Sequence, residues 1–498
     1  KRQANGSWVI ALGDASDWQL YWLDPNNLRL PEVQALVNVD KLSLLPDNSG
    51  VLVSKEKWLR HLGRDGQLKW EQELPTEVVH IAAVPSSKGF IVQFADQSVQ
   101  KWVTVNVQGA LQYETVFEVE KLAPIKQVLF FPQKMTALLH TDESLILFNS
   151  TTGRLLNMQR WRELVPEQLA GKFVWQESRL VWQSDNMLIP FTIQNSNSSL
   201  TLENLFSRIW YEGYQSPEYV WQSASGADYN EPKYSVIPLM MGSVKAAVLA
   251  IIVALPLGFG AAVYTAYFAP KAGRQWLKPA IEMLEAIPSV VLGFIAAIWL
   301  LPLAEEHLVG VLSFFLLLPL FAFIIAMINK ALFQTTGRSL PVDLPFCFFY
   351  LLIFASVLSF IVPLVMELMS NLHLPSIFFL EDEDTHSKNT VVVAIALGIA
   401  IAPSIYSLAE DAIYEVPVAL RRASYALGAT RLQTLLNVVL KVAYPGILSA
   451  LMLGFSRALG ETMILLMVTG NTPIAEWDLV AGMRTMTANL AIELPESE

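Results

Sequence analysis

The second half of the chain holds six apolar segments, and these constrain the fold more than any other feature. They lie near residues 243–268, 281–303, 308–329, 345–368, 391–408 and 446–470. About twenty helical residues cross the hydrocarbon core of a bilayer. Backbone exposed to lipid must also satisfy its own hydrogen bonds, so the sequence predicts transmembrane helices here. With 53% hydrophobic and 16% charged residues, the 498-residue chain has the composition of an integral membrane protein with a soluble part.

The charges between these segments predict the topology. Basic residues follow the first, third and fifth segments, namely Lys271, Arg274, Lys278, Lys330, Arg338, Arg421, Arg422, Arg431 and Lys441. The other loops are acidic, with Glu305 and Glu306 in one and the run 381–384 in another. By the positive-inside rule, the basic loops face the cytoplasm and the first half of the chain lies outside it, in a bacterial periplasm. We expect an anchoring helix before Lys1, and we expect the natural chain to continue past Glu498.

Before about residue 234, short runs of β-branched and aromatic residues alternate with polar turns, which predicts β structure. Four turns recur, namely Asp24–Asn27, Arg64–Gly66, Gln108–Gly109 and Thr151–Gly153, with 195–199 as a candidate fifth. Each of the four follows an apolar strand. A spacing of about 40 residues between strand–turn–strand units predicts propeller-like blades. A β-sandwich with coincidental spacing is the alternative.

These patterns divide the chain into three parts. We predict an all-β, propeller-like periplasmic domain over 1–205 and a linker over 206–234. An α-helical polytopic membrane domain follows over 235–498, with a cytoplasmic loop over about 409–443. The chain is long enough for more than one domain.

Ionisable residues inside the apolar segments are candidates for function. Arg457 and Glu461 lie within the last segment and are four residues apart, which on a continuous helix places them on one face. Ionisable groups at this depth usually face protein or a water-filled path. Glu282 and Glu285, by contrast, are assigned only a structural role, because they are predicted to lie at the cytoplasmic start of the second helix, where negative charge complements the helix dipole.

The loop 411–441 predicts two short helices interrupted at Gly428, because glycine tolerates the left-handed conformation that ends a helix. Small and apolar residues form one face of the first helix, namely Ala419, Leu420, Ala423, Ala426 and Leu427. Such a face suits docking into a groove on another protein. A helix lying on the membrane surface is the alternative.

Two motifs resemble the permeases of ABC importers. Arg422-Ala423-Ser424 with Gly428 is similar to the cytoplasmic signature loop of that family, which begins Glu-Ala-Ala and has glycine four residues after the last alanine. Arg422 stands where the family has glutamate, and Lys441 stands where it has proline. The segment 454–463, Gly-Phe-Ser-Arg-Ala-Leu-Gly-Glu-Thr-Met, closely resembles the phosphate-specific members of the family. The resemblance covers roughly 235–490, with an insertion near 305–385.

The resemblance implies the type I importer fold, also called MetI-like, and a permease subunit in the bacterial inner membrane. Its expected partners are a second permease subunit, two cytoplasmic ATPase subunits, a periplasmic phosphate-binding protein, phosphate and membrane lipid. The residues expected to couple the permease to the ATPase are Arg422, Ala423, Ser424, Leu427 and Gly428. The residues expected to line the translocation path are Arg457, Glu461 and Thr462.

Two roles remain open for the charged pair. Arg457 would attract the anion, because arginine matches phosphate geometry, and Glu461 would neutralise Arg457 when no anion is bound. A structural ion pair that only fixes helix packing is the alternative.

Other features narrow the chemistry. No Walker A motif is present, so we expect ATP hydrolysis in a separate subunit. Six scattered histidines and a single cysteine lack zinc-ligand spacing, so we expect no metal and no cofactor. A net charge of −11 argues against nucleic acid as a partner. The alternatives to a phosphate importer are an importer for sulfate or molybdate, and a membrane-anchored β-propeller scaffold or sensor.

Overall fold

The computed structural model describes residues 8–494 with interruptions, and the chain separates into two compact units, 1–236 and 237–498. The gaps longer than four residues are 161–170, 192–201, 224–232, 304–309, 329–343, 372–389 and 476–481, and shorter gaps occur elsewhere, notably within 312–327. The predicted β domain and linker, 1–205 and 206–234, both fall within the first unit.

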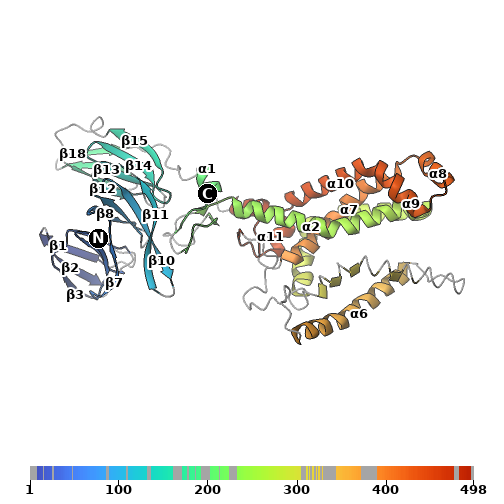
Figure 1. Ribbon diagram of the computed structural model, residues 1–498, viewed down its shortest axis with the longest axis horizontal. Helices are drawn as coiled ribbons and strands as arrows, with labels where there is room; N and C mark the ends of the chain where they lie inside the picture. The colour runs from blue at the N-terminus through green and yellow to red at the C-terminus, as the bar shows by residue number, and fades with distance from the viewer. Residues whose placement is uncertain are drawn as a thin grey trace. The chain divides into compact units, whose positions relative to one another are not determined.

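The first unit contains five antiparallel sheets in succession, which we call blades 1 to 5 (Figure 1). Blade 1 consists of β1 (Trp8–Asp14), β2 (Asp17–Asp24) and β3 (Asn27–Leu36). Blade 2 consists of β4 (Lys41–Leu44), β5 (Val51–Lys55), β6 (Trp58–Leu62) and β7 (Leu68–Glu73). Blade 3 consists of β8 (Val78–Ala83), β9 (Phe90–Phe94), β10 (Val99–Val107) and β11 (Ala110–Val119). Blade 4 consists of β12 (Ile125–Phe130), β13 (Thr136–Thr141), β14 (Ser144–Asn149) and β15 (Leu155–Arg160). Blade 5 consists of β16 (Gly171–Gln176), β17 (Arg179–Ser184) and β18 (Met187–Phe191).

The repeating turns of the sequence mark the same place in four blades. Each lies between the last two strands of its blade, for example Arg64–Gly66 between β6 and β7. The first strands of neighbouring blades contact one another, β4 with β8, β8 with β12 and β12 with β16. The predicted propeller-like fold is therefore confirmed, whereas the candidate fifth turn, 195–199, lies outside the described residues.

Hydrophobic cores lie between adjacent blades, so inner strands such as β5, β9 and β13 are buried on both faces. β5 shows how the sequence achieves this with a period of two residues. Val51 and Val53 pack with blade 1, whereas Leu52, which points the other way, packs with blade 3. Similar cores join blade 3 to blade 4 and blade 4 to blade 5. Stacking of successive blades thus buries apolar surface that no single sheet could bury alone.

The segment predicted as a linker carries local structure of its own. It begins at the end of α1 (Leu202–Phe206) and includes β19 (Trp221–Gln222) paired with β20 (Lys233–Tyr234). Ile209 and Tyr211 are buried in a small cluster there.

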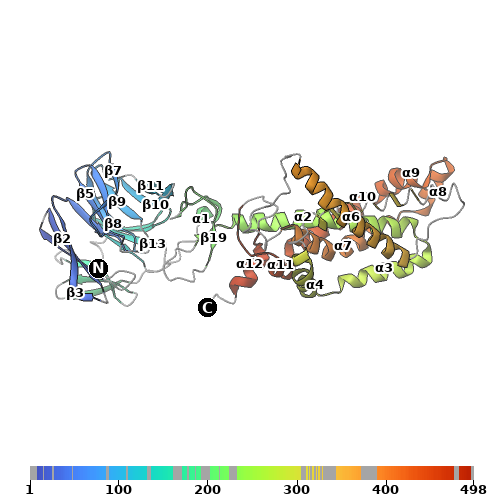
Figure 2. The same cartoon turned by 90° about the horizontal axis from the view of Figure 1, so that it is seen from below.

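The second unit is helical. Its helices are α2 (Ile237–Val263) continuing as η2 (Tyr264–Phe268), α3 (Lys271–Glu285), α4 (Ser289–Ile295) continuing as η3 (Ala296–Leu300), α6 (Leu344–Asn371), α7 (Thr390–Tyr414), α8 (Val418–Ala426), α9 (Arg431–Thr434) continuing as η4 (Leu435–Val439), α10 (Leu440–Gly460), α11 (Met463–Val468) and α12 (Met486–Glu493). Helices α8 and α9 lie at one end of this unit and α11 lies at the other (Figures 1 and 2).

Three of the described helices are long and apolar enough to cross a membrane, over 237–268, 392–414 and 431–460. The first two correspond to the predicted segments 243–268 and 391–408. The third overlaps the predicted segment 446–470 only over 446–460, because the helix begins at Arg431, inside the predicted loop 409–443, and ends at Gly460. The predicted segment 345–368 is also helical, as α6, with a shorter apolar stretch over 350–365. Most of the predicted segment 308–329 lies outside the described residues.

The prediction of one continuous transmembrane helix in the second apolar segment is wrong. Residues 281–303 do not form a single helix, because α3 ends at Glu285 and α4 starts at Ser289 after a bend of 84°. Pro288 explains the break, since the residue before a proline is pushed away from helical conformation. The first helix of this pair also begins earlier than predicted, at Lys271.

Helix α7 is the centre of the second unit, and it packs against α2, α3 and α10. Glycines allow the close approach. A Cβ at Gly454 of α10 would lie 2.7 Å from the side chain of Ile405 on α7, and one at Gly398 would lie 2.7 Å from Val253 on α2. Small residues at helix contacts are typical of membrane proteins. This packing brings polar residues of α3, α7 and α10 together.

Candidate functional site

Arg457 and Glu461 do not share a helical face, which corrects the prediction. Helix α10 ends at Gly460, and Glu461 follows in an extended conformation with φ −68° and ψ 131°. The spacing argument assumed a helix that runs through 446–470, but glycine is a weak helix former and the next helix starts only at Met463. The two side chains therefore have different partners.

Arg457 contacts side chains from two other helices. Its Nη1 lies 2.5 Å from a carboxylate oxygen of Glu285, the last residue of α3. The same nitrogen donates to the hydroxyl of Ser404 on α7, and that hydroxyl donates to Glu285 at 2.9 Å. We call these three residues the Arg457 triad. It joins α3, α7 and α10 at one point.

The depth of the triad follows from helix geometry. Ser404 precedes the end of α7 at Tyr414 by ten residues, which at the helical rise is about 15 Å. The side chains of Arg457 and Glu285 are still 38% and 39% exposed. Charged groups that lie beside the interior of α7 and are not fully covered by their own chain are typical of a transport path.

Glu461 has a local role at the start of the next helix. Its carboxylate accepts hydrogen bonds from the backbone N–H of Met463 at 3.2 Å and of Ile464 at 3.5 Å. A negative side chain at this position complements the positive end of α11. The backbone carbonyl of Glu461 accepts from the hydroxyl of Thr487 at 2.8 Å. The hydroxyl of Thr462, the third predicted residue, donates weakly to the carbonyl of Gly460 at 3.4 Å.

A second group of charges lies between α3 and α7. The guanidinium of Arg274 makes two hydrogen bonds to the carboxylate of Glu410, at 2.6 and 3.1 Å, and Glu410 is fully buried. The ammonium of Lys278 lies 3.1 Å from Glu410 and also donates to Asp411. Buried carboxylates need such partners, because an uncompensated charge is costly to bury. We call this group the α3–α7 clasp.

The clasp borders a cavity of about 270 Å³. It is lined by Lys271, Arg274, Gln275, Lys278, Pro279, Glu282 and Tyr414. The guanidinium of Arg274 lies 3.5 Å from the ring centroid of Tyr414. Two of the cations at this cavity, Arg274 and Lys278, are already matched by the carboxylates of the clasp.

The placement of Glu282 and Glu285 corrects a second prediction. Both lie in the last turn of α3, not at the start of a helix, because the helix begins at Lys271 and stops before Pro288. Negative charge is unfavourable at a helix C-terminus. Hydroxyls and cations compensate it: Ser407 donates to Glu282 at 3.0 Å, and the triad holds Glu285.

Sequence reasoning missed both α3 and α7 as sources of site residues. A signal was present. Arg274, Lys278 and Glu282 recur every four residues and so share one helical face, and Ser404, Ser407 and Asp411 recur at three and four residues on α7. Matching polar faces on two neighbouring helices would have indicated that the helices meet.

The predicted docking helix is α8, and none of its residues is buried. Leu427, the residue after it, is 90% exposed. Arg422 and Ala423 are exposed as well. Ser424 faces inward instead, and its hydroxyl lies 2.8 Å from that of Thr434, which ties α8 to the chain beyond it. The C-terminal end of α8 therefore exposes an apolar residue, while Ser424 fixes the helix to the following segment. Such a surface is suited to bind another protein.

Gly428 makes the predicted sharp turn between α8 and α9. Its φ is +83°, and no heavy atom lies within 4 Å of where a Cβ would stand. The requirement for glycine is therefore conformational rather than steric. Thr430 and Gln433 then form a capping box that starts α9. The hydroxyl of Tyr267, at the end of η2, bonds Tyr425 of α8 at 2.7 Å.

Comparisons with known proteins show which proteins have similar sequences. Residues 254–495 match the family described as binding-protein-dependent transport system inner membrane component. The chain is 30% identical over 245 residues to the probable ABC transporter permease protein YqgH of Bacillus subtilis, covering 49% of this chain and 55% of that protein. It is 28% identical over 272 residues to the phosphate transport system permease protein PstC of Pasteurella multocida, covering 54% of this chain and 68% of that protein.

The PstC protein of Mesorhizobium japonicum is 26% identical over 265 residues, covering 53% of this chain and 64% of that protein. The chain thus spans just over half to two thirds of the length of these relatives. Among solved structures, the β-propeller domain of Myceliophteria thermophila Cps50 aligns with 36% of this chain and covers 63% of that chain, at 12% identity and a TM-score of 0.28, which is too weak to support a conclusion.

The matched region contains the Arg457 triad, the α3–α7 clasp and the α8 docking helix. A chain with these features in an inner-membrane transport domain is not a simple membrane anchor. The helical half of this protein belongs to the ABC transporter permeases of the binding-protein-dependent type, and its relatives include the Pst-type phosphate permeases.

Proposed function

We propose that this protein is the transmembrane permease subunit of an ATP-driven importer for inorganic phosphate. The observation that carries the proposal is the Arg457 triad. It presents a partly exposed guanidinium beside Ser404, about 15 Å from the end of α7, within a sequence segment similar to phosphate permeases. Guanidinium groups bind phosphate oxygens through paired, charge-assisted hydrogen bonds.

Glu285 and Ser404 give the triad a way to release and recover its anion. Without phosphate, the carboxylate of Glu285 neutralises Arg457. This pairing avoids the free-energy cost of an isolated charge within the membrane. An arriving phosphate competes with Glu285 for the guanidinium, and the Ser404 hydroxyl offers it a further donor. The net affinity for the anion is therefore the difference between the Arg457–phosphate and the Arg457–Glu285 interaction energies. Such a weakened affinity lets the anion leave the site again, as transport requires.

The proposed assembly follows from the resemblance. Cytoplasmic ATPase subunits dock on α8 and the exposed Leu427, and a second permease subunit completes the path. The β unit lies in the periplasm, where a phosphate-binding protein delivers its cargo. ATP binding closes the ATPase subunits, and α8 transmits that motion to the helices, so that the path faces alternately outward and inward.

The test is anion competition in cells whose other phosphate importers are deleted. We expect uptake of labelled phosphate to depend on this chain and to be inhibited by unlabelled phosphate far more than by sulfate or molybdate. Preferential uptake of sulfate or molybdate would assign the same permease to the other oxyanion. Energised cells that take up none of the three anions through this chain would refute the proposal.

A further inference from the structure

A cavity between blades 2 and 3 is not explained by transport. It has a volume of about 400 Å³ and is lined by Trp70, Glu71, Gln72, Trp102, Leu111, Gln112, Tyr113, Glu114 and Thr115. The first three residues belong to β7, and the last five belong to β11. These are the outermost strands of neighbouring blades, and they contact each other. Small-molecule sites typically measure about 300–1,000 Å³.

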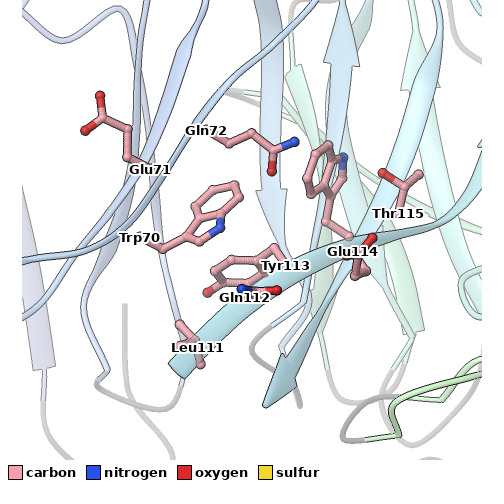
Figure 3. Close-up of a pocket in the computed structure, with 9 residues that line it drawn as sticks. Trp70, Glu71, Gln72, Leu111, Gln112, Tyr113, Glu114 and Thr115 are labelled. Carbon is pink, nitrogen blue, oxygen red and sulfur yellow. The ribbon is translucent and has the colours of Figure 1, made fainter. Parts of the chain in front are cut away.

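Aromatic side chains form one wall of this cavity. The rings of Trp70 and Tyr113 have centroids 4.7 Å apart, and Trp70 and Trp102 have centroids 6.0 Å apart. Figure 3 shows Trp70 and Tyr113 next to each other, with Gln72 above Trp70 in this view. Phe90 packs behind, 5.0 Å from Tyr113 and 6.1 Å from Trp102. The wall is therefore supported by the core between the blades.

Three polar groups beside the aromatic wall make no hydrogen bond to the described part of the protein. In the described part of the chain, neither the side-chain amide of Gln72 nor the hydroxyl of Thr115 has a hydrogen-bond partner, and the same holds for the indole N–H of Trp70. All three side chains are half-buried. They offer a ligand three N–H donors, a carbonyl acceptor and a hydroxyl.

The described cavity lining includes the carboxylates of Glu71 and Glu114 and no lysine or arginine, which argues against an anionic ligand. Glu71 is matched by Arg60, whose guanidinium donates to it at 3.0 and 3.2 Å. A cage for an organic cation would need open aromatic faces around the charge. Here Trp70 is inclined at 64° to Tyr113 with an edge-on contact, so the rings cover one another instead of enclosing a space.

We propose that this cavity binds a neutral, polyhydroxylated ligand of the size of one or two sugar residues. A sugar ring presents an apolar face to the aromatic wall and hydroxyls to the amide and hydroxyl groups beside it. Gln72 is the specificity-determining contact, because its amide can donate and accept at once. The β unit would thereby hold the permease against a glycan, and this role does not depend on which anion the helices carry.

The test uses the full chain in nanodiscs, because the headgroups of maltoside and glucoside detergents would themselves compete. Glucose, maltose, N-acetylglucosamine and its β-1,4-linked disaccharide are titrated by saturation-transfer NMR and calorimetry, with choline chloride as a cationic comparison. We expect at least one saccharide to bind saturably. Gln72→Leu and Thr115→Val should each weaken that binding about threefold to tenfold, the loss expected for one hydrogen bond.

A matched control is Gln159→Leu, which removes an exposed amide from β15, the outermost strand of blade 4. It should leave binding unchanged. The two cavity variants remove groups without partners, so they should fold normally, which thermal unfolding checks. Three results would each overturn the proposal: no saccharide bound at tens of millimolar, choline bound instead, or saccharide binding that Gln72→Leu leaves intact. Phosphate uptake, measured in parallel, should not change in any of these variants.

Discussion

Arg457 meets Glu285 and Ser404 where three helices converge, and its interaction with Glu285 crosses 172 residues of sequence. Each of the three side chains makes a hydrogen bond to both of the others. The contact holds the end of α3 against α7 and α10, so the same residues that could meet an anion also fix the helices that form its path. Glu461, the nearer acid in sequence, instead starts α11.

A double-mutant cycle separates these two acids. We expect Glu285→Ala and Arg457→Ala to be coupled by about 0.5–3 kcal/mol in thermal or denaturant unfolding, as for residues in one polar network. Glu461→Ala and Arg457→Ala should be additive, because the two side chains have different partners. Coupling of Arg457 to Glu461 but not to Glu285 would contradict the assignment of the triad.

His140 of β13 gives the β unit a dependence on pH. Burial, with a smaller contribution from nearby Lys126, lowers the pKa of His140 from 6.5 to about 4. The folded state therefore keeps the ring neutral while the unfolded state binds a proton. Stability from this residue is complete above pH 6.5 and is lost as the pH falls from 6.5 to 4, by roughly 3 kcal/mol at most.

His140→Leu tests that expectation. The melting temperature of the β unit, followed in the intact chain by tryptophan fluorescence, should fall more steeply from pH 7 to pH 5 in the native protein than in the variant. Some slope should remain, because burial and Lys41 also lower the pKa of His80. Equal slopes would show that His140 does not titrate in this window.

Among the helices, α3 is the one whose position decides the site. It carries clasp residues at its start and Glu285 at its end, and it contacts α7. Its sequence is amphipathic, with charges recurring every four residues, which is why a hydropathy reading assigns its first half to a loop. The bend before α4 could be anticipated from Pro288, but the partner of each charge could not, because those pairings depend on how the helices pack.

Removal of Glu410 should weaken the clasp strongly. Glu410→Ala leaves Arg274 and Lys278 without their buried partner, and breaking such a buried network costs about 3–5 kcal/mol. Scanning fluorimetry of the detergent-solubilised chain should show a lower melting temperature for Glu410→Ala than for Ser407→Ala, which removes only one hydroxyl contact from the same helix. A native-like melting temperature for Glu410→Ala would show that the clasp does not hold α3.

The exposure of α8 leads to a prediction about assembly with the ATPase subunits. Leu427 is 90% exposed, so Leu427→Asp should leave folding unchanged while abolishing co-purification of ATPase subunits. The physical reason is that a charge would be buried without a partner in the docked state. Leu155→Asp, at an exposed leucine of β15, is the control and should keep the ATPase bound. Retention of the ATPase by folded Leu427→Asp would count against docking at α8.

For the molecule as a whole, regular features were predictable and long-range contacts were not. The turn spacing predicted blades, and apolar length predicted the helices over 237–268 and 392–414, because both depend on local periodicity. Gly428 was predictable from its need for a left-handed backbone. The Arg457 triad was not, since a four-residue spacing suggested Glu461 and only the packing of α3 on α7 brings Glu285 close.

The two units also call for different tests. Glycan binding by the β unit and anion transport by the helical unit rest on separate residues, so either can fail without affecting the other. The proposed transport path depends on Arg457 above all, because no other residue of the triad carries a positive charge.

The most direct measurement is ATP-dependent phosphate uptake by Arg457→Ala and Arg457→Lys, with membrane insertion and ATPase co-purification verified for each. We expect the alanine variant to lose uptake, because it has no cation to compete for the anion. We expect the lysine variant to retain part of it, since an ammonium binds phosphate as a point charge without the paired geometry of arginine. Normal phosphate uptake by a correctly inserted, ATPase-bound Arg457→Ala variant would contradict a role for this residue in the path.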